Sequence, residues 1–359
     1  METKQILFHD EFDCRLDTVA LDPLKDDEIC CQAIKSVISV GSETISFRRK
    51  FDPEMIRTQE LGHPAGAGYS MAAEVIKVGK DVLDYKVGDI VFAREQHKQH
   101  FNINPSFRVS HMPEWMSVDE VCWTTILRAG LFAAMKANVK YSDTVVILGL
   151  GIFGMASLQF ARLLGANKII AIDPIKQRTD RALLFGATDI ITARAQNGNF
   201  MVSENTAQYN LDKEFENPIR DQLIQINNGN LADCAIDATA AAEGLSAACV
   251  LTRNGGHVAL IADPPNITNQ HVGSNILLGY LNIHGIFINM MEEDPNDFYP
   301  LTIQGVHAAI YEHIRKSEIN VKDMITDYVS PADPTTVYQS LYENRSERLG
   351  VLYDWSLIP

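Results

Sequence analysis

Cysteine is scarce in this sequence of 359 residues. No two of its cysteines have the spacing of a zinc knuckle, which places ligands about two to four residues apart. Six in a chain of this length are also too few for a disulfide scaffold. We expect them to be small buried hydrophobic residues in a reducing cytoplasm. They are Cys14, Cys30, Cys31, Cys122, Cys234 and Cys249.

Basic residues are also few, since the chain has 31 Lys and Arg but 46 Asp and Glu, which gives a net charge of −15. This balance argues against binding to nucleic acid or to anionic membranes, both of which need a basic face. The N-terminus lacks the basic and apolar regions of a signal peptide. The longest apolar run, 145–156, contains three glycines and is too short to span a bilayer. We therefore expect a cytoplasmic protein that acts on a small molecule.

Apolar residues make up 46% of the chain, enough for a sizeable core, and the length suggests two domains. In residues 1–120, predicted strands at 33–40, 72–78 and 89–92 are separated by turn residues. This pattern favours a compact, barrel-like β domain. A helix is predicted over 116–136, with Ser117 and Glu120 in the spacing of a capping box.

Residues 141–290 alternate between apolar strands and helices, a pattern typical of a doubly wound parallel sheet. The polar stretch 197–216 is interpreted as a solvated surface insertion. The predicted strands of this part are 145–149, 168–172, 187–191, 234–237, 257–261 and 281–288.

The motif Gly149-Leu-Gly-Ile-Phe-Gly154 follows the first of these strands and opens a helix. The first glycine permits a tight turn, the second lets a pyrophosphate approach the backbone, and the third lets helix and strand pack closely. The N–H groups at the start of the helix attract phosphate. The motif therefore predicts a dinucleotide site. Its residues are Gly149, Gly151, Ile152, Phe153 and Gly154.

Asp173 ends the next strand and supports the same prediction. Its carboxylate would accept hydrogen bonds from the adenosine ribose hydroxyls and repel a 2′-phosphate, which favours NAD over NADP. Lys176 and Arg178 follow closely and would weaken that preference. The predicted cofactor is NAD, with NADP as the alternative.

Over nearly its whole length the chain resembles the medium-chain dehydrogenase/reductase superfamily, which includes zinc alcohol dehydrogenases, sorbitol dehydrogenases and quinone reductases. The resemblance rests on segments 73–79, 85–92, 145–191, 237–240 and 254–261. It implies a GroES-like β-barrel domain formed by 1–127 and 290–359, with a Rossmann domain at 128–289 between them. It also implies a homodimer joined through the sheet edge near 281–288. The cofactor contacts that it implies are Ile261, Ala262 and Phe287 for the nicotinamide, and Arg348 for the pyrophosphate.

The family's catalytic zinc ligands do not carry over. Their positions fall at Val40, Tyr69 and Thr125, which are poor zinc ligands, and 92–105 lacks the cysteines of the structural zinc lobe. We therefore expect no metal, and regard His97 and His100 as ordinary surface or strand histidines. In its 41–43 and 68–70 segments the chain resembles a zinc-lacking branch that includes bacteriochlorophyllide dehydrogenase and sugar-type dehydrogenases.

Without zinc, hydride transfer needs a proton donor or acceptor beside the substrate oxygen. Tyr69 is predicted to donate from its phenol, Ser42 to relay a proton, and Glu43 to act as a base or to hold a substrate hydroxyl. Thr125 and His63 are weaker candidates. The competing structural interpretations are that Tyr69 is a core aromatic residue and that Glu43 caps a local turn.

The predicted function is therefore transfer of hydride between a nicotinamide and an alcohol or carbonyl of a polar metabolite, such as a polyol, a sugar or an intermediate of secondary metabolism. The first alternative is a zinc-free quinone or enoyl reductase that acts on C=C bonds. The second is a binding protein that kept the fold but lost the activity.

Overall fold

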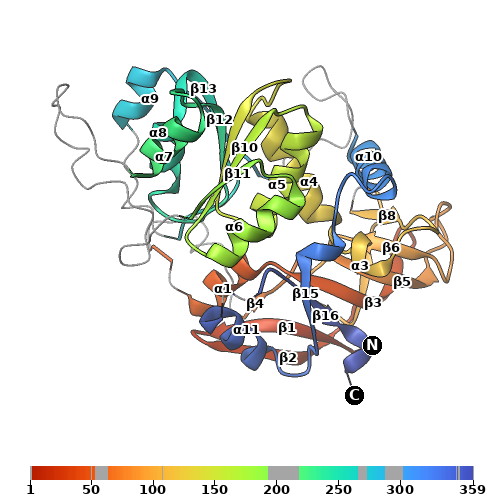
Figure 1. The fold of residues 1–359 in the computed structure, drawn as a ribbon. Coiled ribbons are helices and arrows are strands. Elements are labelled where there is room, and N and C mark those ends of the chain that lie inside the picture. The colour runs from red at the N-terminus through yellow and green to blue at the C-terminus, as the bar shows by residue number, and fades with distance from the viewer. Residues whose placement is uncertain are drawn as a thin grey trace. The chain divides into compact units, whose positions relative to one another are not determined.

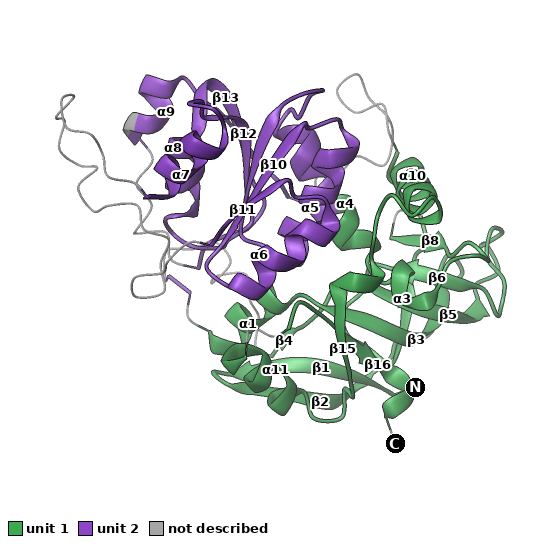
Figure 2. Ribbon diagram, in the orientation of Figure 1, with its two compact units in different colours: residues 1–50, 56–128, 288–359 green, residues 51–55, 129–287 purple. Residues whose placement is uncertain are grey.

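The computed structural model describes residues 2–49, 51–52, 64–106, 108–192, 218–265, 273–287, 302–344, 346 and 348–358. The chain forms two compact units (Figure 2). Unit 1 comprises Met1–Lys50, Ile56–Arg128 and Ile288–Pro359, and unit 2 comprises Phe51–Met55 and Ala129–Phe287. The predicted insertion 197–216 and the candidate His63 lie outside the described residues. Among the helices of the described ranges, none is long and apolar enough to cross a membrane.

Unit 2 contains a six-stranded sheet in the order β11-β10-β9-β12-β13-β14, and every neighbouring pair is parallel. The doubly wound parallel sheet predicted from the sequence is thereby confirmed (Figure 1). The strands are β9 (Thr144–Leu148), β10 (Lys168–Asp173), β11 (Asp189–Thr192), β12 (Ala232–Asp237), β13 (Thr252–Leu260) and β14 (Asn282–Gly285). The helices are α5 (Ile152–Leu163), α6 (Lys176–Ala182), η1 (Leu183–Phe185), α7 (Pro218–Ile226), α8 (Gly244–Leu251) and α9 (Gly273–Gly279).

Strand β9 has no apolar–polar alternation because both of its faces are buried. Val146 and Leu148 belong to a core cluster that includes Leu223 of α7 and Ala248 of α8. Val145 and Ile147, on the opposite face of the strand, are also fully buried. A parallel sheet covered on both faces explains this continuous apolar run.

Unit 1 is built on a separate sheet in the order β15-β16-β3-β5-β6-β8, with β7 also paired to β3. A three-stranded sheet, β2-β1-β4, lies in the same unit. The strands are β1 (Glu2–Asp10), β2 (Asp13–Ala20), β3 (Ile29–Ile38), β4 (Ala65–Gly66), β5 (Met71–Val78), β6 (Ile90–Ala93), β7 (His100–Ile103), β8 (Val109–His111), β15 (Ile325–Val329) and β16 (Gly350–Asp354). The helices are α1 (Val40–Arg48), α3 (Val118–Val121), α10 (Ile303–Arg315), η4 (Lys322–Met324), α11 (Pro334–Glu343) and η5 (Trp355–Leu357).

Two local predictions were wrong. The strand predicted at 33–40 ends at Ile38, because Ser39 donates its N–H to Glu43 Oε1 and helix α1 begins at Val40. The helix predicted over 116–136 is interrupted after α3, and α4 (Thr124–Lys136) begins two residues after Cys122. The predicted capping box of Ser117 and Glu120 is confirmed at the start of α3.

Candidate active site

The glycine motif forms the turn between β9 and α5 in unit 2. Gly149 has φ of +82°, in the left-handed region, and a Cβ there would lie 2.9 Å from backbone atoms of Ala238 and Thr239. Only glycine fits this conformation and this close approach without strain. The tight turn predicted at Gly149 is therefore present.

The other two glycines of the motif differ in their surroundings. A Cβ on Gly154 would lie 1.8 Å from the carbonyl oxygen of Gly149, so the helix packs directly on the turn. A Cβ on Gly151 would meet no atom within 4 Å. Gly151 is also the N-cap of α5 and supplies no side chain to cap its first N–H groups. This open, donor-rich helix start fits the pyrophosphate of a dinucleotide.

Two predicted members of the motif lie in the first turn of α5. Ile152 is buried with an exposed fraction of 5%, and Phe153 is half-buried. Their side chains support the loop, and their contact with the cofactor stays a prediction.

Asp173 is the last residue of β10, and its carboxylate faces the same turn. Its Oδ2 accepts the N–H of Leu150 at 2.7 Å, and its Oδ1 accepts the N–H of Ile175 at 2.8 Å. The residue is 3% exposed. Each oxygen retains a further lone pair, so the carboxylate is held in place with acceptor capacity for ribose hydroxyls.

Arg178 lies near this carboxylate, with its Nη1 3.9 Å from Asp173 Oδ2. Burial lowers the pKa of the Arg178 guanidinium, and the charge of Asp173 opposes that change. Both predicted specificity residues therefore lie at the same end of β10. Their effect on the choice between NAD and NADP stays a prediction.

The other predicted cofactor contacts lie elsewhere in the chain. The N–H of Ile261 donates to the carbonyl of Asp237 at 3.0 Å, which holds the segment after β13. Phe287 follows β14, and 59% of its surface is exposed. Arg348 belongs to unit 1, where its Nε lies 3.8 Å from Asp327 Oδ1. Its contact with the pyrophosphate stays a prediction.

Asp237, which ends β12, was not among the predicted site residues. Its Oδ1 accepts the N–H of Thr239 at 3.0 Å and the hydroxyl of Thr239 at 2.7 Å. This turn places Thr239 against Gly149. Burial raises the pKa of Asp237 to about 6, although both bonds from Thr239 act in the opposite direction. An acidic residue at the end of a buried strand, as at Asp173, was the signal in the sequence.

Unit 1 brings together the segments that carry the predicted catalytic residues. The hydroxyl of Thr125 donates to the carbonyl of Tyr69 at 3.3 Å, and Ser70 Oγ donates to the carbonyl of Cys122 at 2.6 Å. Tyr69 is half-buried, with a buried hydroxyl oxygen. Ser42 lies in the first turn of α1 and is also half-buried.

These side chains do not fit a zinc ion. Val40 has no donor atom, and the Thr125 hydroxyl is committed to the Tyr69 carbonyl. Zinc prefers thiolate, imidazole or carboxylate ligands. In the part of the chain that the structure describes, no group of three or more His, Cys, Asp or Glu residues is placed to hold a metal ion.

Glu43 lies in a buried hydrogen-bonded cluster. Its Oε1 accepts the N–H of Ser39 at 2.7 Å, so it caps the start of α1, as one interpretation of the sequence held. Its Oε2 accepts the hydroxyl of Tyr338 and lies 3.2 Å from Nε2 of His97. Glu43 is only 5% exposed. Direct action of Glu43 on a substrate stays a prediction.

His97 is fully buried and lies in no strand, so its interpretation as an ordinary surface or strand histidine was wrong, whereas His100 begins strand β7 as that interpretation allows. The Nδ1 of His97 lies 2.7 Å from Ser36 Oγ, which accepts the indole N–H of Trp355 at 2.9 Å. Glu43 lies 54 positions from His97 in the sequence, and Trp355 lies 319 positions from Ser36. No local sequence pattern could therefore have shown this cluster.

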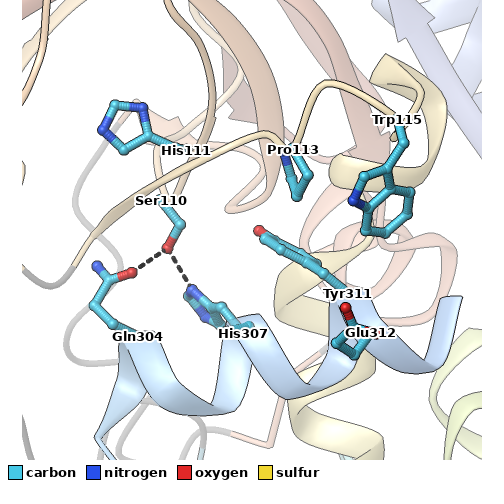
Figure 3. A pocket seen from close by; sticks show the side chains of 9 residues that line it. Ser110, His111, Pro113, Trp115, Gln304, His307, Tyr311 and Glu312 are labelled. Carbon is cyan, nitrogen blue, oxygen red and sulfur yellow. Dashed lines mark hydrogen bonds between the residues drawn. The ribbon is translucent and has the colours of Figure 1, made fainter. Parts of the chain in front are cut away.

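A second polar chain in unit 1 borders an open pocket of about 390 Å³ between the 110–115 segment and α10 (Figure 3). Gln304 Nε2 donates to the carbonyl of Val109, so its Oε1 accepts from Ser110. Ser110 Oγ lies 2.6 Å from His307 Nδ1, and His307 Nε2 lies 3.3 Å from Arg128 Nη1. Burial, with Arg128 nearby, lowers the pKa of His307 to about 3. A neutral imidazole therefore links Arg128 to Ser110.

Comparison with known proteins agrees with the fold. Residues 153–304 match the family described as zinc-binding dehydrogenase. D-guloside 3-dehydrogenase of Escherichia coli K12 is 24% identical over 80% of this chain and 77% of its own. Sorbitol dehydrogenase 1 of Saccharomyces cerevisiae is 24% identical over 68% of this chain and 72% of its own.

The fold match extends over the whole chain. A crystal structure of an Escherichia coli oxidoreductase of unknown specificity aligns with a TM-score of 0.76 and 20% identity, covering 99% of both chains. This likeness shows a GroES-like domain combined with a Rossmann domain. Taken together, residues 153–304 match the zinc-binding dehydrogenase family, and the chain is similar in sequence to sugar and polyol dehydrogenases and in fold to a solved oxidoreductase.

Proposed function

We propose that this protein transfers hydride between NAD and an alcohol or carbonyl carbon of a polyhydroxylated metabolite, and that it does so without a catalytic zinc. The observation that carries the proposal is the glycine turn joined to Asp173, which offers an open helix start beside a fixed carboxylate. The similarity to guloside and sorbitol dehydrogenases supports a polyol or sugar as substrate. NADP is the alternative cofactor because Arg178 lies beside Asp173.

The chemistry that the bound nicotinamide supplies is acceptance or donation of the hydride. The chain must then handle the proton of the substrate hydroxyl. In carbonyl reduction the phenol of Tyr69 would donate this proton to the substrate oxygen, in alcohol oxidation its phenolate would take the proton up, and the hydroxyl of Ser42 would relay it. The hydrogen bond from Thr125 to the Tyr69 carbonyl fixes the backbone that carries the phenol.

The zinc-free part of the proposal rests on the donor atoms available. Val40, Tyr69 and Thr125 stand where the family resemblance expects zinc ligands, and none of their side chains is a thiolate, imidazole or carboxylate. Acid–base catalysis by side chains is then the remaining way to stabilise charge on the substrate oxygen.

A turnover screen tests this proposal. NAD and a panel of polyols and sugar glycosides are incubated with the protein, and NADH absorbance is followed. A parallel panel of enones and quinones with NADH or NADPH tests the C=C alternative. Turnover of a saturated alcohol supports the proposal. Turnover of the enone panel alone would establish the alternative, and NADH binding without any turnover would favour a binding protein.

Two further features complete the proposal. We place the protein in the cytoplasm because the six cysteines are buried and unpaired, as suits a reducing compartment. We also propose a homodimer joined through β14, which is the last strand on one side of the unit 2 sheet. Sedimentation analysis of the purified protein tests the dimer.

A further inference from the structure

We infer that His97 is a positioning residue. It fixes the segment of Tyr69 to the segment of Ser42, so that both side chains are held in the positions that the reaction with the substrate needs. The inference rests on the proposed function, because it assigns His97 to the same reaction. It depends on contacts within unit 1 alone.

The first link joins His97 to the Tyr69 segment. Its backbone N–H donates to the carbonyl of Ala67 at 2.7 Å. Gly68 has φ of +85°, and a Cβ there would lie 2.6 Å from atoms of the His97 ring. The imidazole therefore packs directly on the backbone next to Tyr69, and movement of the ring would displace that backbone.

The second link joins His97 to the Ser42 segment. Its Nε2 lies 3.2 Å from Oε2 of Glu43, the residue that follows Ser42 in α1. The other oxygen of Glu43 accepts the N–H of Ser39 and closes the start of the same helix. Through one carboxylate, His97 is thus connected to both sides of Ser42.

The hydrogen bonds define the direction of donation through the cluster. The indole N–H of Trp355 only donates, and the Glu43 carboxylate only accepts. One arrangement satisfies every group between them: Trp355 donates to Ser36, Ser36 donates to Nδ1 of His97, and Nε2 of His97 donates to Glu43. The ring is held from both sides while His97, Ser36 and Glu43 are all buried, so it has little freedom to rotate.

This burial also excludes another activity. Ser36, His97 and Glu43 have the residue types of a serine hydrolase triad, but Ser36 and His97 are fully buried. Trp355 and Glu43 occupy the two ends of the chain of bonds. The cluster therefore holds backbone segments in place and offers no exposed nucleophile.

The test compares His97→Phe, which keeps a ring but removes both of its hydrogen bonds, with His97→Gln, which keeps polar atoms. His100→Phe is the matched control, since His100 begins β7 and its imidazole is outside the cluster. The first readout needs no substrate. The ¹³Cζ resonance of Tyr69, assigned from Tyr69→Phe, is expected to shift or broaden in His97→Phe, to shift less in His97→Gln, and to stay unchanged in His100→Phe.

The second readout is turnover per folded enzyme, with folded sites counted by NADH titration. We expect kcat of His97→Phe to fall by roughly 10- to 100-fold, as for a misplacement of about 1 Å, with KM and NADH affinity unchanged and partial recovery in His97→Gln. If His97→Phe does not fold, the Tyr69 resonance in Glu43→Gln tests the same link, because this variant preserves the shape but weakens the bond to Nε2.

If a folded variant lacks the bond between His97 and Glu43 and its Tyr69 resonance is unchanged, the inference is wrong. This test needs no known substrate. Absence of turnover in the wild-type enzyme would instead contradict the proposed function, and the resonance would still decide the role of His97.

Discussion

Asp173 Oδ2 accepts the backbone N–H of Leu150 at 2.7 Å, and this bond ties the end of β10 to the glycine turn that follows β9. The carboxylate that we propose to select the cofactor is thus bonded to the loop that we propose to hold the cofactor's phosphates. We therefore expect cofactor affinity and the shape of the turn to depend on the same side chain.

Replacement of this carboxylate should weaken NADH binding. Asp173→Asn removes the charge and leaves one accepting oxygen for two backbone N–H groups and the ribose. Since hydrogen bonds to a charged group contribute about 1.5–3 kcal/mol, we expect a loss of NADH affinity of roughly 10- to 100-fold. NADPH affinity should fall less, because the charge that repels the 2′-phosphate is gone. Fluorescence titration measures both, with Asp180→Asn on α6 as a control. A wild type that prefers NADPH would refute the assignment.

Replacement by alanine should have different effects on stability and on NADH affinity at two glycines of the turn. Gly154→Ala places a methyl group against the Gly149 carbonyl, so we expect a loss of roughly 1–3 kcal/mol in the free energy of unfolding. In Gly151→Ala the new methyl group meets no protein atom, so the free energy of unfolding should fall by less than about 1 kcal/mol. NADH affinity should nevertheless decrease, because we expect this methyl group to face the pyrophosphate. Urea unfolding and NADH titration separate the two effects. Unchanged NADH affinity in Gly151→Ala would remove this turn as the phosphate site.

Asp237 should make stability depend on pH. Its folded pKa of about 6 lies above the ordinary value of 3.8 because burial disfavours the charge. Its contribution to stability is therefore complete at low pH and is lost as the pH rises through about 6. Asp237→Asn does not titrate, so its stability relative to wild type should increase between pH 4 and pH 8 by at most about 3 kcal/mol.

Urea unfolding of the cofactor-free protein across that pH range measures the difference. Asp221→Asn, an exposed position in the first turn of α7, is the control. A difference for Asp237→Asn that is independent of pH would show that Asp237 has an ordinary pKa.

Loss of the Tyr69 phenol should affect turnover and leave cofactor binding intact. General acid–base catalysis contributes about 10²- to 10⁴-fold, so Tyr69→Phe is expected to lower kcat by at least roughly 100-fold at constant NADH affinity. Tyr85→Phe, in the same unit, is the control, since the Tyr85 hydroxyl donates to the Val109 carbonyl at 3.5 Å. Full activity in Tyr69→Phe would assign the proton to another group.

Local signals in the sequence were sufficient for the parallel sheet and the glycine turn. The run 145–149, the glycine spacing and Asp173 lie within one strand–helix–strand unit, and the physics of each acts over a few residues. The interruption between α3 and α4 was not predictable in the same way. Trp123 lies there fully buried with its ring against Gly350, a contact that sequence spacing does not reveal.

The catalytic residues were predicted from the positions that the family resemblance supplies, and their catalytic roles stay predictions. Glu43 was predicted because it falls beside a position where the family resemblance expects a zinc ligand, but its partners His97 and Tyr338 come from 54 and 295 residues away. Those contacts exist only after the strands of unit 1 have paired. A buried polar cluster of this kind is determined by tertiary packing, and its residues look ordinary in the sequence.

We propose that this protein oxidises an alcohol without zinc. The most direct measurement determines the zinc content of protein dialysed against a chelator and, on the same sample, the rate of NAD reduction with the best polyol of the screen. We expect far less than one zinc per chain with the rate unchanged, and no increase when zinc is added. A rate that disappears with zinc and returns in proportion to one bound ion per chain would contradict it.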